Sequence, residues 1–374
     1  MFGLYIHIPF CVSKCNYCDF NSYKMDKKIK DRYLKDLKVE MNLYKNDAKE
    51  VTSIFIGGGT PSILTSEEIK DLFESITENF NIKKDAEITI ECNPGTLTLE
   101  KLKTMKEVGI NRLSMGLQAT QNYHLKSIGR IHTYEEFEKN YKQALQVGFE
   151  NINIDLMYAL PNQKTYEWKE TLEKIVNLKP AHISAYSLIL EEGTKLYEMY
   201  ENNEFRLTDE DVDIKMYNYT IEYLKSNGYT QYEISNYSKD GYECIHNILY
   251  WKCENYIGLG AGASGYIKDI RYSNVNSLED YHEKIILNQK PIGEIETLSI
   301  EDKTQEKIFM GLRMNEGIKF IDFKKEFKID FEGKYNNVIK ALLTKELIKK
   351  DENGIRLTQK GREISNSIFI EFMD

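Results

Sequence analysis

The sequence of 374 residues has few cysteines and no long apolar run. Six cysteines in a chain of this length exclude the dense disulfide framework of small secreted domains. No stretch approaches the roughly 20 apolar residues that a membrane-spanning helix needs, and the mean hydropathy is -0.52. The first residues already resemble a strand and lack the features of a cleavable leader. These absences predict a soluble, cytoplasmic protein without a transmembrane segment, in which the thiols stay reduced.

Positive charge is also in short supply. The chain has 50 Lys and Arg against 59 Asp and Glu, a formal net charge of -9 at pH 7. Proteins that bind nucleic-acid phosphates through their surface charge carry the opposite balance. We therefore expect no nucleic-acid partner and no direct binding to an anionic membrane.

Strand-like and helix-like segments alternate over the first half of the chain. Thr65 with Glu68, and Thr133 with Glu136, have the spacing of helix capping boxes. About six βα units in a row predict an α/β fold with a parallel sheet, in a barrel or part of one. The predicted strands are residues 4–8, 53–56, 87–91, 112–117, 151–156 and 182–187, and predicted helices include 26–44, 99–108 and 166–178.

The C-terminal part has a different pattern. From about Leu298 helices predominate, and two short apolar runs then flank Asn353-Gly354, which predicts a β-hairpin. Helices followed by a short hairpin are typical of a winged-helix module, and many such modules bind DNA. Residues 298–374 hold 15 Lys and Arg against 14 Asp and Glu, so we predict packing or partner docking instead.

The most informative motif is Cys11-x3-Cys15-x2-Cys18, directly after the first predicted strand. Three thiolates on a short loop can hold three irons of a [4Fe–4S] cluster and leave the fourth iron open to another ligand. A zinc site is the alternative, but it needs a fourth ligand close by. His7 is the nearest histidine, and Pro9 separates it from the cysteines.

Five predicted strands end in residues with useful chemistry. They lead to the cysteine loop, the run Gly57-Gly58-Gly59-Thr60-Pro61, Glu91, Gln118 and Asp155. Each has an ordinary explanation alone, as a tight turn, an exposed strand tip or a helix cap. The carboxyl ends of parallel barrel strands share one rim, however, and this rim is where active sites lie.

One ligand suits these groups. The glycine run lets an amino-acid group approach without a clash from Cβ, and a carboxylate such as Glu91 can accept hydrogen bonds from ribose hydroxyls. An open iron can chelate the amine and carboxylate of a methionyl group. The rim therefore predicts S-adenosylmethionine bound over a [4Fe–4S] cluster.

In combination these motifs resemble the radical SAM superfamily. The segments YIHIPFC, CNYCDFN, GGGTPS, ECNPG, SMGLQ, IGRIH and HNILYW are similar to the oxygen-independent coproporphyrinogen oxidase-like family, and within it to the HemW haem chaperones. The resemblance covers nearly the whole chain. It implies a partial (β/α)6 TIM-like barrel over residues 1–295, with a family-specific extension at about 190–295, and a winged-helix-like domain over residues 296–374.

The resemblance also implies roles for single residues. Cys11, Cys15 and Cys18 would ligate the cluster. The family chemistry is reductive cleavage of S-adenosylmethionine to methionine and a 5′-deoxyadenosyl radical. Residues expected to contact S-adenosylmethionine are Tyr5, Tyr17, Gly58, Gly59, Thr60, Glu91, Gln118, Arg130 and Asp155.

Two departures separate this chain from the coproporphyrinogen enzymes. Those enzymes have a further Cys where Phe20 stands here, and an N-terminal extension that this sequence lacks. Both departures argue against decarboxylation of coproporphyrinogen and match the HemW branch.

We therefore expect a haem chaperone that passes haem to an acceptor haemoprotein, for example a membrane-bound respiratory enzyme. The cluster and S-adenosylmethionine would regulate the transfer, through dimerisation to a homodimer or through contact with the acceptor. The alternative is a radical SAM oxidoreductase acting on coproporphyrinogen III or a related tetrapyrrole, so enzymatic activity stays open.

The segment HNILYW is the candidate haem contact, through His246, Tyr250 and Trp251. Imidazole is a common axial ligand of haem iron, and aromatic rings can flank a porphyrin. The alternative is core packing at the edge of the sheet, and the residues alone leave both interpretations open.

Two further patterns have ordinary interpretations. Gly258-x-Gly260-x-x-Ala263 resembles a dinucleotide-binding loop, but it stands alone without a well-placed acidic residue, so we predict no nicotinamide site. Cys92, Cys244 and Cys253 lack the paired spacing of metal ligands, and we expect ordinary thiols.

Overall fold

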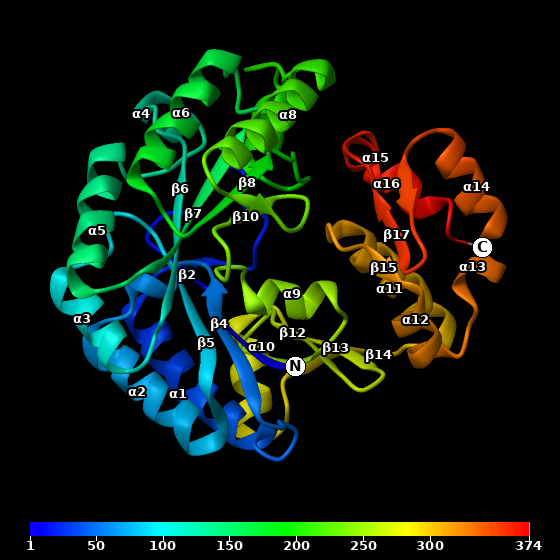
Figure 1. Cartoon of the computed structure of the whole chain (residues 1–374). Helices are drawn as coiled ribbons and strands as arrows, with labels where there is room; N and C mark the ends of the chain where they lie inside the picture. Colours follow the sequence, from blue (N-terminus) through cyan, green and yellow to red (C-terminus); the bar gives the residue numbers. More distant parts are fainter. Residues whose placement is uncertain (374) are drawn as a thin grey trace.

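Six neighbouring parallel strands form the centre of the fold in the computed structural model, which describes residues 1–373 (Figure 1). The order of these strands along the sheet follows their order in the chain. The six predicted strands are therefore confirmed. Their bounds are β1 (Phe2–Ile8), β4 (Val51–Gly58), β5 (Ile82–Cys92), β6 (Arg112–Gln118), β7 (Asn151–Tyr158) and β8 (His182–Ser187).

Helices connect these strands and form an arc around the outside of the sheet (Figure 1). Both predicted capping boxes are present, at Thr65 with Glu68 and at Thr133 with Glu136. Gly148 ends its helix in the left-handed conformation, with φ 91°. The helices of the arc are α1 (Lys27–Tyr44), α2 (Ser66–Asn79), α3 (Leu99–Glu107), α4 (Asn122–Ser127), α5 (Tyr134–Val147) and α6 (Thr165–Leu178).

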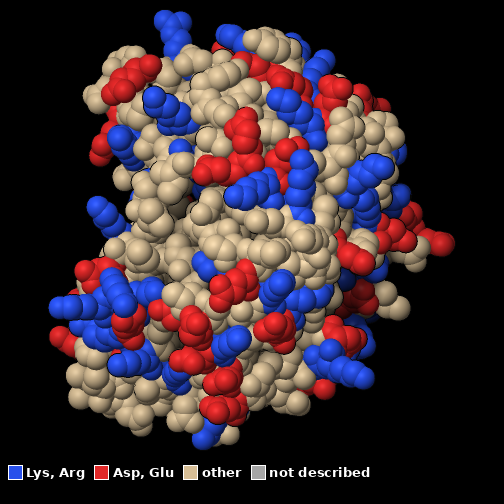
Figure 2. Space-filling view, turned by 90° about the vertical axis from the view of Figure 1, so that its left-hand side faces the viewer, with Lys and Arg blue, Asp and Glu red and all other residues tan. Residues whose placement is uncertain are grey.

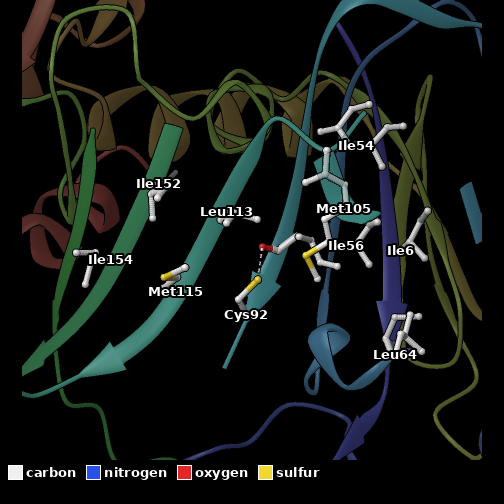
Figure 3. Packing of buried hydrophobic residues seen from close by; sticks show 14 of the residues in the cluster. Ile6, Ile54, Ile56, Leu64, Cys92, Met105, Leu113, Met115, Ile152 and Ile154 are labelled. Carbon is white, nitrogen blue, oxygen red and sulfur yellow. Dashed lines mark hydrogen bonds between the residues drawn. The ribbon is translucent and has the colours of Figure 1, made fainter. Parts of the chain in front are cut away.

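Strand alternation divides the side chains between two environments. Apolar side chains of the strands form one buried core with apolar side chains of the outer helices. Figure 3 shows Ile54, Ile56, Leu113, Met115 and Ile152 of this core together with Met105 of α3. The neighbours of the strand residues in sequence point to the inside of the barrel. This division explains why the core and the candidate site are built from the same strands.

The sheet extends beyond the six predicted strands on both sides. After β1 come β11 (Asn255–Leu259), which is parallel to β1, and then the antiparallel strands β12 (Ser264–Ile267), β13 (Ile270–Asn274) and β14 (Ile292–Thr297). On the far side, β10 (Asn236–Ser238) and β9 (Thr230–Gln231) run antiparallel after β8. The helices in this part are α7 (Lys195–Glu201), α8 (Glu210–Ser226), α9 (Ile245–Trp251) and α10 (Leu278–Ile286).

The glycine-rich run after β11 has a structural role. The backbone N–H of Gly260 donates to Oε2 of Glu40 at 2.7 Å, and the same carboxylate accepts from Tyr281 and Asn274, each at 2.7 Å. Glu40 is completely buried. A Cβ on Gly260 would lie 2.7 Å from the His7 carbonyl oxygen, so glycine here lets the chain pack closely on β1.

Helix α9 lies across the barrel at the amino ends of the strands. Glu87, in the first half of β5, accepts hydrogen bonds from the backbone N–H groups of Ile245 (3.0 Å) and His246 (3.1 Å) in the first turn of α9. Ser53, near the start of β4, bonds to the His246 ring. A carboxylate is favourable at a helix N-terminus, so Glu87 holds α9 in this place.

The C-terminal module has its own hydrophobic core, made by residues between Ile308 and Phe372. The predicted hairpin is confirmed: β16 (Ile348–Lys350) pairs antiparallel with β17 (Gly354–Leu357), and β15 (Ile318–Lys319) pairs with the other edge of β17. Its helices are α11 (Ile300–Arg313), α12 (Phe320–Phe327), α13 (Phe331–Lys334), α14 (Asn336–Thr344), α15 (Gln359–Glu363) and α16 (Ser365–Ile370).

The module lies beside the barrel, with α9 between the barrel strands and α11 (Figure 1). The Arg313 guanidinium is 5.6 Å from the Trp251 ring centre, and Lys307 donates to the carbonyl of Lys252 at 3.0 Å. Helix α9 is thus in contact with both parts of the molecule.

The surface charge is mixed on the face that Figure 2 shows, where blue and red side chains alternate over the outer helices. Within residues 1–373, no helix combines the length and the apolar character needed to cross a membrane.

Candidate functional site

The barrel encloses a cavity of about 590 Å³ that extends from the cysteine loop to α9. We call it the barrel cavity. Its wall contains residues from the rim and from the interior of β4 to β8, and Asn247 of α9 also borders it. The predicted site residues that line it are Cys11, Cys15, Cys18, Tyr17, Gly58, Gly59, Thr60, Glu91, Gln118, Arg130 and Asp155.

The cysteine loop begins in the short strand β2 (Phe10–Cys11), which pairs with β3 (Tyr23–Lys24). The Thr60 hydroxyl donates to Cys11 Sγ and Arg130 Nη1 donates to Cys15 Sγ, each at 3.5 Å. Burial raises the pKa of Cys11 and raises that of Cys18 to about 11. These thiols stay protonated near neutral pH, and a bound metal would have to displace their protons.

His7, the nearest histidine in the sequence, does not supply the fourth ligand that a zinc site needs. Nδ1 of His7 is 2.9 Å from the Tyr5 hydroxyl and Nε2 is 2.8 Å from the Asn21 carbonyl, so both ring nitrogens have partners. Within residues 1–373, no three His, Cys, Asp or Glu side chains converge as ligands of one metal ion.

The glycine run requires glycine for two different reasons. Gly58 has φ +112°, in the left-handed region, and a Cβ there would be 2.5 Å from the His7 ring. A Cβ on Gly59 would be 2.8 Å from the backbone nitrogen and oxygen of Phe10. The glycine run at the end of β4 therefore packs directly on the segment that carries Cys11. The 3-10 helix η1 (Pro61–Ile63) follows the glycine run.

Two carboxylates line the cavity. Glu91 accepts from the backbone N–H of Gly58 at 3.1 Å, and burial, with the nearby Asp155, raises the pKa of Glu91 to about 8. Asp155 accepts from Ser114 at 3.0 Å and Asn153 at 2.7 Å, and burial raises its pKa as well. These groups can accept hydrogen bonds from a ligand that carries hydroxyls or positive charge.

Arg130 and Gln118 are fixed by residues that the sequence did not single out. Arg130 Nη2 donates to Asn93 Oδ1 at 2.8 Å and also to the Gly116 carbonyl. Gln118 has φ 75° and accepts from the Tyr186 hydroxyl at 2.9 Å. The position of Asn93 inside ECNPG and that of Tyr186 in the sixth predicted strand are the signals that could have found them.

The two predicted tyrosines lie in different places. Tyr17 borders the barrel cavity. Tyr5 borders a second cavity of about 370 Å³, which shares Phe20, Gly58 and Glu91 with the first. The structure thus places Tyr5 beside the site but not in the wall of the main cavity.

His246 is buried, with 1% of its surface exposed. Its Nδ1 is 2.9 Å from the Ser53 hydroxyl and its Nε2 is 2.9 Å from the Tyr250 hydroxyl. Burial, with the nearby Arg112, lowers the pKa of His246 to about 3. In this conformation the imidazole is neutral and neither nitrogen is free to bind iron.

The other two residues of the predicted haem contact face separate spaces. Tyr250 borders the 370 Å³ cavity near Tyr5. Trp251 borders a third cavity of about 250 Å³ between α9 and the C-terminal module. The structure does not bring His246, Tyr250 and Trp251 to one surface.

Comparison with known proteins first defines the class. Residues 5–175 match the family model of the radical SAM superfamily, and residues 298–364 match that of the HemN C-terminal domain. The solved structure of coproporphyrinogen III oxidase (HemN) from Escherichia coli, described as a radical SAM enzyme, aligns with a TM-score of 0.87 at 24% identity. The alignment covers 100% of this chain and 90% of that one, which confirms the predicted fold class.

The family follows from more similar relatives. Proteins named heme chaperone HemW are 39% identical in Lactococcus lactis, 36% in Bacillus subtilis and 32% in Escherichia coli. The alignments cover 99%, 100% and 99% of this chain and 96%, 99% and 98% of those proteins. The chain belongs to the HemW family, which confirms the resemblance found in the sequence.

Proposed function

We propose that this protein is a haem chaperone that binds haem and passes it to an acceptor haemoprotein. The observation that carries the proposal is the full-length similarity to proteins named heme chaperone HemW, at 32–39% identity. The C-terminal module over residues 296–374 is our candidate for the surface that contacts the acceptor. We include a homodimer in the proposal as the form in which transfer is regulated.

The cysteine loop fits a [4Fe–4S] cluster, and we propose Cys11, Cys15 and Cys18 as its ligands. The thiols border one cavity, and the Arg130 guanidinium that donates to Cys15 would offset part of the negative charge of a thiolate-bound cluster. When bound, such a cluster and S-adenosylmethionine would supply one-electron reductive chemistry.

The rim fits S-adenosylmethionine for reasons of shape and of hydrogen bonding. Gly58 and Gly59 leave no room for a Cβ but keep backbone groups accessible at the cavity wall. Glu91 would accept from ribose hydroxyls, and Arg130 has a buried Nε without a partner. We propose the following contacts: Tyr5, Tyr17, Gly58, Gly59, Thr60, Glu91, Gln118, Arg130 and Asp155.

For haem we propose contact with α9 through His246, Tyr250 and Trp251. Because both nitrogens of His246 are hydrogen-bonded and the ring is buried, we infer that iron reaches this histidine only when α9 moves. Burial does not distinguish His246 from His7, His124, His132 and His182, which are buried as well. His246 is proposed because it lies in the segment HNILYW, which resembles the HemW chaperones.

The experiment is an anaerobic haem titration of the cluster-reconstituted protein, followed by its Soret band. We expect saturable one-to-one binding, which His246→Ala weakens at least tenfold and free imidazole partly restores. His124→Ala is the matched control, because His124 is also buried but pairs with Glu167 on the other side of the barrel. Absence of saturable binding by the wild-type protein would contradict the proposal.

The second candidate is a radical SAM oxidoreductase acting on coproporphyrinogen III or a related tetrapyrrole. The observation that favours it is that all the predicted rim residues except Tyr5 line one cavity. Such an enzyme would form 5′-deoxyadenosine under reducing, anaerobic conditions only when its substrate is present. Phe20, at the position where the resemblance expects a further Cys, weighs against coproporphyrinogen itself, and a rate unchanged by coproporphyrinogen III would eliminate that substrate.

A further inference from the structure

We propose that the deep end of the barrel cavity, at Arg112, binds a carboxylate of a ligand. Arg112 is the first residue of β6, borders the cavity and is only 1% exposed. Within residues 1–373 its guanidinium makes no ion pair or side-chain hydrogen bond, and its Nε is buried without a partner. A buried N–H group without a hydrogen-bond partner is costly to a fold, and a forked guanidinium matches a carboxylate in shape and charge.

The nearby carboxylates are occupied by other groups. Glu87 uses its two oxygens for the backbone of Ile245 and His246 at the start of α9. Asp155 accepts from Ser114 and Asn153. Both lie close enough to raise the pKa of Arg112, but within residues 1–373 neither forms a hydrogen bond or an ion pair with its guanidinium, which leaves the guanidinium N–H groups available to a ligand.

A second observation lies on the neighbouring strands. Thr89 of β5 and Asn151 of β7 are the register partners of Arg112, one on each side. Thr89 Oγ1 and Asn151 Oδ1 are both buried without a hydrogen-bond partner. Unpartnered buried polar groups are rare in folded proteins, and three side by side indicate a place where a ligand completes the bonding.

This place is distinct from the rim. Gln118 ends the strand that Arg112 begins, and at ~3.3 Å per residue the two positions are about 20 Å apart along β6. Asn247 of α9 borders the same cavity and closes its deep end. The methionyl carboxylate of S-adenosylmethionine is expected at the open iron on the rim, so a ligand carboxylate at Arg112 would come from a tetrapyrrole propionate.

The test compares Arg112→Met, which keeps the length of the side chain but removes its charge, with wild type. Haem, its dimethyl ester and S-adenosylmethionine are titrated separately into the full-length protein. Loss of a charge-assisted pair should weaken one carboxylate ligand about 10- to 100-fold. We expect haem to bind more weakly and its diester to bind as before, which identifies a propionate. S-adenosylmethionine, whose carboxylate is expected at the open iron, should bind unchanged.

The difference between haem and its diester separates this role from a structural one. Arg112→Met should lower the melting temperature of the ligand-free protein, because the positive charge attracts Glu87 and Asp155, but a purely structural role would weaken haem and its diester alike. Arg271→Met, the control, removes a guanidinium that pairs with Glu306 at 2.7 Å outside the cavity, and should lower the melting temperature without changing ligand binding. If Arg112→Met does not fold, Arg112→Lys, which keeps the charge but not the fork, is titrated in its place.

Unchanged affinity for all three ligands, or equal weakening of haem and its diester, would overturn the proposal. This inference rests on the proposed haem binding. A wild-type protein that fails to bind haem would remove the proposed function, whereas wild-type and Arg112→Met proteins that bind haem equally well would remove only the carboxylate site.

Discussion

The buried carboxyl groups of Glu40 and Glu91 differ in whether a ligand can reach them. Glu40 is completely buried, and all of its hydrogen bonds come from the protein itself. Glu91 has a raised pKa too, but it faces a cavity and has only one backbone donor. Burial makes both carboxyls hard to ionise, and only Glu91 has open space in front of it for a ligand.

Replacing any one of Cys11, Cys15 or Cys18 by Ala should abolish the visible absorption of the reconstituted cluster, since each proposed ligand binds a different iron. Cys92→Ala is the control, because Cys92 is 2% exposed and its thiol donates to the Ile90 carbonyl at 3.7 Å (Figure 3). Full cluster absorption in a Cys11, Cys15 or Cys18 variant would contradict the ligand assignment.

Glu40 should make the protein less stable as pH rises. Burial raises its pKa from 4.5 to about 7, so between these values the folded state keeps a proton that the unfolded chain has released. The stabilisation is complete below about pH 4.5 and is lost as pH rises through 7, by about 3 kcal/mol in total. Urea unfolding at pH 5 and pH 8 measures it.

Glu40→Gln should reduce this fall in the free energy of unfolding, since the amide does not titrate. Glu100→Gln, at a surface position in the first turn of α3, should leave the fall unchanged. The same loss of stability in Glu40→Gln as in wild type would show that other groups cause it.

At the scale of elements, the glycine run and the cysteine loop pack against each other so closely that Gly59 has no room for a Cβ atom. Gly59→Ala would force its new Cβ against the Phe10 backbone, so we expect the loop to shift and the affinity for S-adenosylmethionine to fall at least tenfold. Gly148→Ala is the control: nothing lies within 4 Å of its Cβ, and only its φ of +91° is unfavourable. It should cost about 1 kcal/mol of stability and leave ligand affinity unchanged.

Local patterns predicted the elements whose stabilising contacts are close in sequence. The capping boxes at Thr65 and Thr133 join residues three positions apart, and the hairpin at Asn353-Gly354 pairs residues five to nine positions apart. The alternation of strands with helices was sufficient to predict the parallel sheet. The strand β11 was missed because its pairing with β1 joins residues such as Leu4 and Ile257, and its glycines do not favour a strand.

The site was predictable where a motif carries the chemistry. The cysteines, the glycine run and Glu91 are recognisable from spacing, and the structure brings them to one cavity. The role proposed for Arg112 could not be predicted from the sequence, because it depends on which residues distant in the sequence form no hydrogen bond with its guanidinium. The hydrogen bonds of His246 could not be predicted from the sequence either, since its partner Ser53 is 193 positions away.

At the scale of the whole molecule, α9 joins the barrel to the C-terminal module. Arg313 of α11 lies 5.6 Å from the Trp251 ring and 5.4 Å from the Phe369 ring, so it connects α9 with α16. Arg313→Ala should lower the local stability of α9 by about 1 kcal/mol and so speed amide hydrogen exchange in Ile245–Trp251 about fivefold.

Arg356→Ala is the matched control, because Arg356 pairs only with Asp351 inside the module. It should not change exchange in α9, and neither variant should change exchange in the centre of β6. Equal protection of α9 in the Arg313 variant and in wild type would mean that the module does not stabilise the helix.

The position of α9 over the barrel has a consequence for the strength of haem binding. If iron binds only after the helix leaves its place, the measured dissociation constant is the intrinsic one divided by the fraction of molecules in the opened state. Every 1.4 kcal/mol that holds α9 shut then weakens apparent affinity about tenfold. Removing the Glu87 cap, with Glu87→Gln, should therefore tighten haem binding, and a partner that loosened or fastened α9 through the C-terminal module would set when haem is taken up and when it is released.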